Sequence, residues 1–178
     1  NFAGAANQTV ILDSTNSVNT SKFDGSSATG NIPLTTIDQT SVSSATDVSV
    51  IGGAGNDSFT LVESNDLSVS GGAGNDTFTM TSIDTSDSVD GGAGTDTMKM
   101  GNTVAQALDG ATRTTFTNVE AITVTDAFDG TLNIKQISSA LDTVNLTLAN
   151  AAIMAGGDQI TGSAGTLNVN IGSSSTNS

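Results

Sequence analysis

The sequence predicts an all-β chain wound as a parallel β-solenoid, and three observations carry this prediction. A nine-residue phrase recurs at residues 52–60, 71–79 and 91–99, in steps of 19 and 20 residues. The composition favours strands and tight turns. Short apolar segments follow one another at a spacing of roughly ten residues, which suits a solenoid or a sandwich. The regular repeat favours the solenoid, because each coil of such an array buries its apolar side only against its neighbours.

The composition is far from that of an ordinary enzyme. The 178 residues suit one domain or a short elongated array, and they are enough to bury a core. The chain holds 28 Thr and 23 Ser, whereas Trp, Tyr, Cys and His are absent. Thr favours strands, while Asp, Asn, Gly and Ser favour turns. Helix formers such as Glu, Lys, Arg and Gln are scarce, so we expect many short strands joined by tight turns.

The charge balance excludes several partner classes. Acids outnumber bases 18 to 4, 16 of the acids are Asp, and the net charge is −14. This charge repels nucleic acids and anionic membrane surfaces, and divalent cations are its natural counter-ions. A chain without cysteine has no disulfide framework, and bound metal is the usual substitute. The sequence has no apolar run long enough for a membrane-spanning helix, and its start at Asn1 fits a processed protein or a fragment.

The chain divides into four expected parts. Residues 1–47 are irregular β coils, with strand candidates at 10–12, 18–25 and 32–37, and Pro33 at a strand start or edge. Residues 48–101 form the repeat. Residues 102–172 continue the solenoid, with a short helix or loop at 104–108 and strands at 116–124, 132–134, 141–148 and 167–171. Residues 173–178 are a polar tail.

Within the repeat, each glycine loop is expected to lie between two strands. The entering strands are 48–50, 67–69 and a short one at Val89. The leaving strands carry Phe59, Phe78 and Met98, which at repeat spacing stack above one another in the core. The half-turns between the phrases, 61–66 and 80–87, lack glycine. One edge of the coil therefore carries near-identical Gly-Asp loops and the other carries variable polar turns.

The recurring Gly-Gly-x-Gly-x-Asp phrase points to calcium. Glycines permit a positive φ, so a tight loop can turn its carbonyl oxygens inward beside the Asp carboxylate. Such an all-oxygen site suits calcium, whereas zinc needs the His or Cys ligands that this chain lacks. Coils about 4.8 Å apart would place Asp57, Asp76 and Asp96 in one column, where a pair repels by roughly 3 kcal/mol at an effective dielectric of ~20. Folding should therefore be coupled to Ca²⁺.

The three phrases resemble the nonapeptide of the RTX (repeats-in-toxin) family, Gly-Gly-x-Gly-x-Asp-x-apolar-x. The resemblance implies a β-roll or β-helix in which calcium lies between successive turns, and export by a type I secretion system. Carried over by position, it implies two groups of ligands. The loop carbonyls are those of Gly53, Gly55, Gly72, Gly74, Gly92 and Gly94. The carboxylates are those of Asp57, Asp76 and Asp96.

Two further features bear on this resemblance. Rolls of the RTX family carry the nonapeptide on both edges, whereas the alternate half-turns here hold residues 63–66 and 84–87 without glycine. The predicted calcium sites therefore lie on one edge of the coil. The Thr-, Ser- and Asn-rich flanks, such as residues 18–25, 116–124 and 141–146, resemble in style the β-solenoid segments of bacterial surface-layer (S-layer) proteins, which form calcium-dependent lattices outside the cell.

Enzyme functions fit poorly. Without His or Cys there is no Ser-His-Asp or Cys-His arrangement and no His-Glu-x-x-His site. A carboxylate pair for glycoside hydrolysis is not excluded by count, but aromatic residues are few. Glu120 is expected inside the 116–124 strand, in a structural ion pair with Arg113 or Lys135, and Lys99 is expected to face solvent.

Two functions of different classes follow. The first is an extracellular, calcium-stabilised structural protein at the cell surface that self-assembles into a bacterial surface layer or filament. Its expected partners are further copies of the chain, with cell-surface polysaccharide as a second partner class. The alternative is the calcium-binding RTX module of a secreted enzyme or adhesin.

Overall fold

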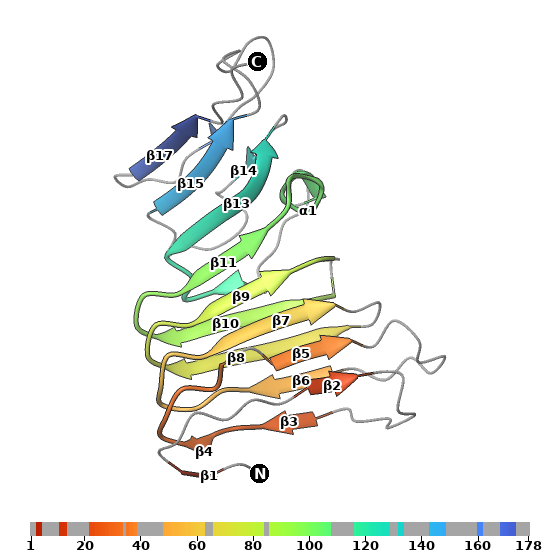
Figure 1. Cartoon of the computed structure of the whole chain (residues 1–178), viewed down its shortest axis with the longest axis vertical. Helices are drawn as coiled ribbons and strands as arrows, with labels where there is room; N and C mark the ends of the chain where they lie inside the picture. Colours follow the sequence, from red (N-terminus) through yellow and green to blue (C-terminus); the bar gives the residue numbers. More distant parts are fainter. Residues whose placement is uncertain are drawn as a thin grey trace.

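The computed structural model shows an elongated stack of parallel strands, with β1 at one end and β17 at the other (Figure 1). The structure describes residues 3–4, 11–13, 22–33, 35–38, 48–62, 66–83, 86–107, 116–128, 132–133, 143–148, 160–161 and 168–173. In these parts of the chain, no helix is long and apolar enough to cross a membrane.

Two sheets form the body of the stack. The eight-stranded sheet has the order β17 (Asn168–Ser173), β15 (Thr143–Leu148), β13 (Ala121–Phe128), β11 (Thr97–Met100), β9 (Thr77–Met80), β7 (Ser58–Val62), β5 (Thr35–Asp38) and β2 (Ile11–Asp13). The five-stranded sheet has the order β12 (Phe116–Thr117), β10 (Ser88–Ala93), β8 (Leu67–Ala73), β6 (Val48–Ile51) and β3 (Lys22–Asp24). Two further pairs join β1 (Ala3–Gly4) to β4 (Ser27–Ala28) and β14 (Leu132–Asn133) to β16 (Ile160–Thr161).

The strands that follow one another along the chain alternate between the two sheets from β6 to β13. Each coil thus contributes one strand to each sheet, and every strand pairs in parallel with the equivalent strand of the next coil. This arrangement confirms the predicted parallel β-solenoid.

The core consists of columns of apolar side chains that run along the stack. The register pairs Phe59 with Phe78, Phe78 with Met98, and Met98 with Ile122, and all four side chains are fully buried. The rings of Phe59 and Phe78 stack with centroids 5.7 Å apart and an interplanar angle of 18°. The predicted stacking of these residues is confirmed. The facing sheet adds a column made of Phe23, Val50, Val69, Val89 and Phe116.

A short helix, α1 (Asn102–Ala107), lies where the chain leaves β11. The helical alternative expected for this region is therefore correct. Ala105 is fully buried in the core, Val104 packs against it, and the helix contacts β13. The backbone N–H of Asn102 donates to Asp126 Oδ1 at 2.5 Å, so a strand in the next coil fixes the start of the helix.

The prediction of one strand over residues 116–124 is wrong. Phe116 and Thr117 belong to the five-stranded sheet, whereas Ala121 opens a strand of the eight-stranded sheet. Between them the chain turns at Asn118, whose φ of 51° is the one positive value of a non-glycine residue in the described ranges. A run of apolar alternation can continue through a corner of the solenoid, because both sheets face the same core. Glu120 therefore lies in a turn.

The N-terminal segment also differs from its prediction. The expected strand at 32–37 begins only at Thr35, and Ile32 lies in a loop although its side chain is fully buried. Pro33 precedes the strand, as its missing N–H requires. The strands expected at 10–12, 132–134, 141–148 and 167–171 are present with shifted ends, and β17 includes Ser173 of the expected tail. Residues 174–178 lie outside the described residues.

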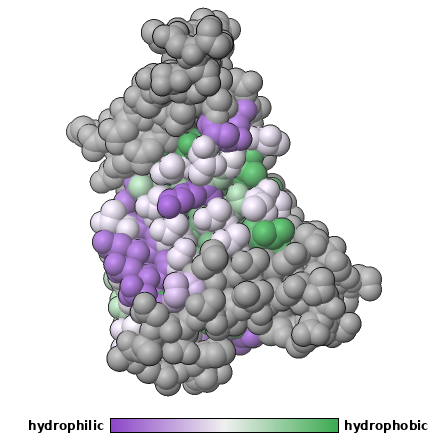
Figure 2. All heavy atoms as spheres, viewed as in Figure 1, coloured by the Kyte–Doolittle hydropathy of each residue, from purple (hydrophilic) through white to green (hydrophobic). Residues whose placement is uncertain are grey.

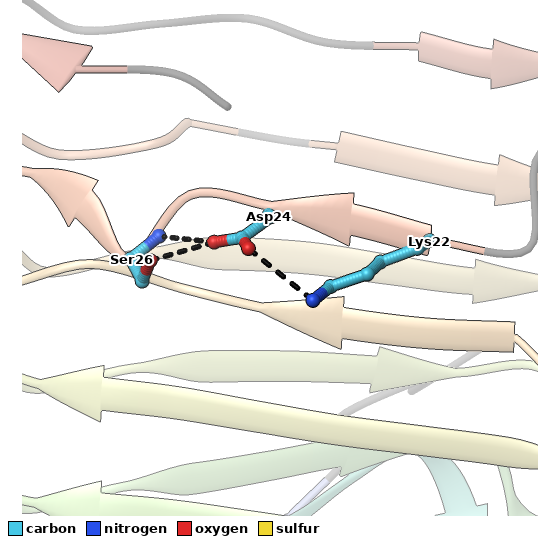
Figure 3. Close-up of polar contacts among 3 residues, drawn as sticks. All are labelled: Lys22, Asp24 and Ser26. Atoms are coloured by element: carbon cyan, nitrogen blue, oxygen red, sulfur yellow. Dashed lines mark hydrogen bonds and ion pairs between the residues drawn. The ribbon is translucent and has the colours of Figure 1, made fainter.

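Asp24 fixes the turn between β3 and β4 (Figure 3). Its Oδ1 accepts hydrogen bonds from Ser26 N at 3.2 Å and from Ser26 Oγ at 2.6 Å, while Oδ2 lies 3.3 Å from Lys22 Nζ. The bonds from Ser26, followed by the contact with Lys22, lower the pKa of Asp24 to about 2. This turn shapes the coil on which the first glycine loop rests.

Candidate metal site

The three glycine loops stack at one edge of the solenoid, where β8 and β10 end (Figure 1). The register places Gly92 beside Gly72 and Ala93 beside Ala73, and the Ala73 N–H donates to the Gly53 carbonyl at 2.9 Å. Figure 2 shows hydrophilic residues gathered over the same edge. The sequence repeat therefore becomes a spatial repeat along this edge.

The three predicted aspartates form one column inside it. The backbone N–H of Asp57 donates to Asp76 Oδ1 at 2.8 Å, and the N–H of Asp76 donates to Asp96 Oδ1 at 2.7 Å. Each carboxylate thus accepts the N–H of the equivalent residue in the preceding coil. Asp57, Asp76 and Asp96 have relative exposures of 2%, 1% and 0%. The expected column is present, and its side chains are more deeply buried than a surface loop would suggest.

Two of these carboxylates each have one oxygen that accepts no hydrogen bond. Among the described residues, the buried side-chain atoms that accept no hydrogen bond are Asp76 Oδ2 and Asp96 Oδ2. A buried acceptor without a donor is costly, and a buried carboxylate without a counter-charge is more so. The ion pair that joins Lys22 to Asp24 lies away from the column. The column therefore has no basic partner among the described residues.

Asp57 differs from the other two aspartates. Its Oδ1 accepts from Ile32 N at 2.7 Å and its Oδ2 accepts from Gly53 N at 2.8 Å, so both oxygens have donors. Gly53 lies beyond the end of β6 and can donate to its own loop, whereas Gly72 and Gly92 lie inside β8 and β10. Identical Gly-Gly-Ala-Gly-Asn-Asp phrases therefore hold their aspartates differently, because their neighbours along the stack differ.

The glycines show the same difference between loops. Positive φ values occur at Gly72 (104°), Gly74 (113°), Gly92 (99°) and Gly94 (146°). Gly53 and Gly55 are not among the described residues with a positive φ, so the expectation of positive φ holds for the second and third loops only. The first loop rests on residues 25–32, which lack the phrase, and its Ala54 N–H donates to the Ala28 carbonyl at 2.9 Å. A neighbour of different shape selects a different backbone conformation.

Four of the six predicted carbonyl ligands point along the stack at the next loop. A β-carbon at Gly72 would collide with the Gly53 carbonyl oxygen, and one at Gly92 would collide with that of Gly72. A β-carbon at Gly74 would collide in the same way with the Gly55 carbonyl oxygen, and one at Gly94 with that of Gly74. These four carbonyl oxygens therefore point along the stack at the next loop. Only glycine permits this close approach of backbone to backbone.

The first glycine of each phrase was not among the predicted site residues, yet it packs against the carboxylate. A β-carbon would lie 2.7 Å from Asp57 Oδ2 at Gly52 and 2.6 Å from Asp96 Oδ2 at Gly91, and at Gly71 it would collide with Asp76 Oδ2. From the next coil, the Gly71 carbonyl oxygen approaches Gly52, and the Gly91 carbonyl oxygen approaches Gly71. The first glycine thus brings a carboxylate oxygen and a carbonyl oxygen to one side of the loop.

Sequence reasoning missed a second row of side chains on this edge. Asn31 Oδ1 accepts from Asn56 N at 2.9 Å, Asn56 Oδ1 from Asn75 N at 2.8 Å, and Asn75 Oδ1 from Thr95 N at 2.9 Å. This asparagine ladder runs parallel to the aspartate column, one residue earlier in each loop. The repeated Asn before Asp57 and Asp76 was the available signal. Asn31 shows that residues 25–32 form a further coil of the stack.

Glu120 was also missed, because it was expected in an ion pair with Arg113 or Lys135. Both basic residues lie outside the described residues. The structure shows the half-buried Glu120 accepting, through Oε2, the backbone N–H of Asp96 at 2.7 Å. It therefore stands one coil beyond Asp96, in the relation that Asp96 has to Asp76. Lys99 is exposed on β11, as predicted.

The column raises the pKa values of its own carboxyl groups. Burial, together with the charges of Asp57 and Asp96, raises the pKa of Asp76 to about 7, although the hydrogen bond from the Asp57 backbone opposes the rise. Burial, with Glu120 and Asp90, also raises the pKa of Asp96. Burial raises the pKa of Asp57 despite its bonds from Gly53 and Ile32. Protons and metal cations therefore compete for the same buried oxygens.

The opposite edge carries no equivalent glycine loops in the described ranges. Asp87 is fully buried and its Oδ1 accepts from Leu67 N, 20 residues earlier, at 3.1 Å, whereas Asp66 is exposed. A single buried aspartate thus links two coils there. Residues 63–65 and 84–85 lie outside the described residues, so two of the four acids of the alternate half-turns, Glu63 and Asp84, are not placed.

The donor set fits a hard cation in the gaps beside Asp76 and Asp96. No group of three or more acidic side chains able to hold a metal occurs in the described part of the chain. Each gap offers at most two carboxylates, so the remaining ligands would be carbonyl oxygens, and calcium accepts roughly six to eight oxygens of both kinds. The two open carboxylate oxygens support the fit at Asp76 and Asp96, whereas Asp57 is already satisfied by backbone donors.

A pair of matched variants should behave in opposite ways. In chelator at pH 7, Asp76→Asn should raise the free energy of unfolding by about 1 kcal/mol or more, because a buried charge disappears while the side-chain carbonyl still accepts the Asp57 N–H. Asp57→Asn should lower it by about 1–3 kcal/mol, because one of two N–H donors would face an NH₂ group. Denaturant unfolding measures both, and a loss of stability in Asp76→Asn matching that in Asp57→Asn would contradict this assignment.

The pH dependence in chelator has a defined sign. In the native protein Asp76 keeps its proton up to about pH 7, whereas in the unfolded chain it releases it near its ordinary value of 3.8. The native state binds more protons between these values, so the free energy of unfolding should fall as pH rises from 4 to 7, by up to about 1.4 kcal/mol per pH unit. Asp76→Asn should flatten the slope. Stability that rises with pH over this range would overturn the pKa assignment.

Comparison with known proteins adds no assignment to this geometry. No family model, no curated protein and no solved structure matches the chain. The candidate site therefore stands on the chain's own residues: the stacked glycine loops, the buried aspartate column and its two open oxygens.

Proposed function

We propose that this chain is an extracellular, calcium-stabilised structural protein that self-assembles into a bacterial surface layer or surface filament. The observation that carries the calcium part is the buried column with the open oxygens of Asp76 and Asp96. The resemblance of the three phrases to RTX nonapeptides supports the same cation. The negative charge of the chain favours a location where free calcium is abundant, outside the cell.

Calcium would be held by Asp76 and Asp96 together with glycine carbonyl oxygens that point along the stack, such as those of Gly55 and Gly74. When bound, the ion supplies the positive charge that the column lacks. The backbone N–H groups of Asp57 and Asp76 orient the carboxylates by bonding to one oxygen of each. Because glycine has no side chain, the second oxygen of each carboxylate stays accessible from the next loop.

The architecture supports a mechanical role. A solenoid grows by adding coils, so its end strands offer unpaired backbone groups to a further copy. The outer face of the eight-stranded sheet carries rows of polar side chains in register: Ser58, Thr77 and Thr97 in one row, and Thr60, Thr79, Lys99 and Thr123 in the next. In this proposal the acids bind cations and fix loops, and none of them acts in catalysis.

Calcium and assembly can be tested on the same preparation. With millimolar calcium, electron microscopy should show ordered sheets or filaments, and these should dissolve when chelator is added. Denaturant unfolding followed by circular dichroism should show a free energy of unfolding that rises with calcium concentration, because ion binding is coupled to folding.

Two outcomes would count against the proposal. A free energy of unfolding at pH 7 that is the same in millimolar calcium and in excess chelator would remove the calcium dependence. A protein that binds calcium but stays monomeric would remove self-assembly and would favour the alternative, a calcium-binding module of a secreted enzyme or adhesin.

A further inference from the structure

The carboxylate column does not end with the glycine phrases. Asp96 N donates to Glu120 Oε2 at 2.7 Å, just as Asp57 N donates to Asp76 and Asp76 N donates to Asp96. The steps between the bonded residues are 19, 20 and then 24 residues. Glu120 thus continues the column from a coil that has no Gly-Gly-x-Gly-x-Asp phrase.

Asp96 keeps one oxygen without a hydrogen bond, against Gly91 of its own loop. The side chain is fully buried, its Oδ2 accepts no hydrogen bond, and a β-carbon at Gly91 would lie 2.6 Å from that oxygen. The same β-carbon would collide with the carbonyl oxygen of Asn118. The carboxylate of Asp96 and the carbonyl of Asn118 therefore meet at one side of Gly91, and both are acceptors.

The turn that carries Asn118 is held in place. Asn118 Nδ2 donates to Asp90 Oδ1 at 2.8 Å, which ties the turn to the strand that leads into the third loop. The Asn118 carbonyl lies at Gly91 beside Asp96 Oδ2, and Glu120 Oε2 lies at the backbone N–H of the same aspartate. The Asp96 N–H orients Glu120 by bonding to Oε2.

We propose that Asp96, Glu120 and the Asn118 carbonyl form a divalent-cation site of the calcium class, which closes the column beyond the last glycine loop. Two carboxylates and a carbonyl offer a hard oxygen donor set, and the chain has no His or Cys that would favour a softer metal. The inference deepens the proposed calcium function and rests on it. The new element is Glu120, which no glycine phrase contains.

The test compares calcium binding by the full chain and by Glu120→Gln, using isothermal titration calorimetry. Gln keeps the side-chain carbonyl that accepts the Asp96 N–H and removes the charge. We expect Glu120→Gln to bind one calcium ion fewer, or to bind it at least about tenfold more weakly, with the remaining steps unchanged. Asp66→Asn is the matched control, because it removes one exposed acid on the opposite edge, and its binding should stay within about twofold of the parent chain.

The outcomes separate this inference from the proposed function. If the parent chain binds calcium and Glu120→Gln binds like Asp66→Asn, the Glu120 site is wrong and the proposed function stands. If the parent chain binds no calcium, both fall. If Glu120→Gln does not fold, Glu120→Asp replaces it, because the shorter side chain keeps the charge but withdraws it from Asp96. A single weakened step supports the site, and unchanged binding by Glu120→Asp overturns it.

Discussion

The structure depends on one repeated interaction, the hydrogen bond from the backbone N–H of one buried acid position to the carboxylate of the next coil. It occurs between Asp57 and Asp76, Asp76 and Asp96, and Asp96 and Glu120. Each such bond fixes the register of two coils at their corner, where sheet pairing stops. A sheet of small β-branched and hydroxylated residues specifies register weakly on its outer face, so the corners carry much of this information.

The same interaction brings an electrostatic cost. Because one oxygen of each carboxylate bonds to backbone, the acids must lie inside the corner, and there they stand close to one another without a basic partner in the described part of the chain. The apolar columns headed by Phe59 and Phe78 can hold the strands together without any ion. Protons or cations that neutralise the corners would lower their free energy. Under the proposed function, the edge of this sheet stack therefore responds to the ionic medium.

Much of this could be predicted from sequence. The period of the phrase gave the stacking of Asp57, Asp76 and Asp96 and of the apolar residues that follow them, because identical residues at coil spacing must lie in register. The failures occurred where a neighbour, and not the phrase itself, decides the conformation. Identical loops differ at Gly53 and Gly72 because the coil before the first loop has another shape. The position of Glu120 in the column could not be predicted, because the apolar alternation of residues 116–124 continues through a corner of the solenoid.

The central claim is that the aspartate corners close fully only with a cation. Hydrogen exchange of the backbone N–H groups of Asp57, Asp76 and Asp96, measured at pH 7 with calcium and with chelator, tests it at those corners. At calcium concentrations 100 times the dissociation constant, an opening that releases the ion should be suppressed roughly 100-fold, so these amides should exchange about 100 times more slowly than in chelator. Equal exchange rates in the two conditions would contradict the account.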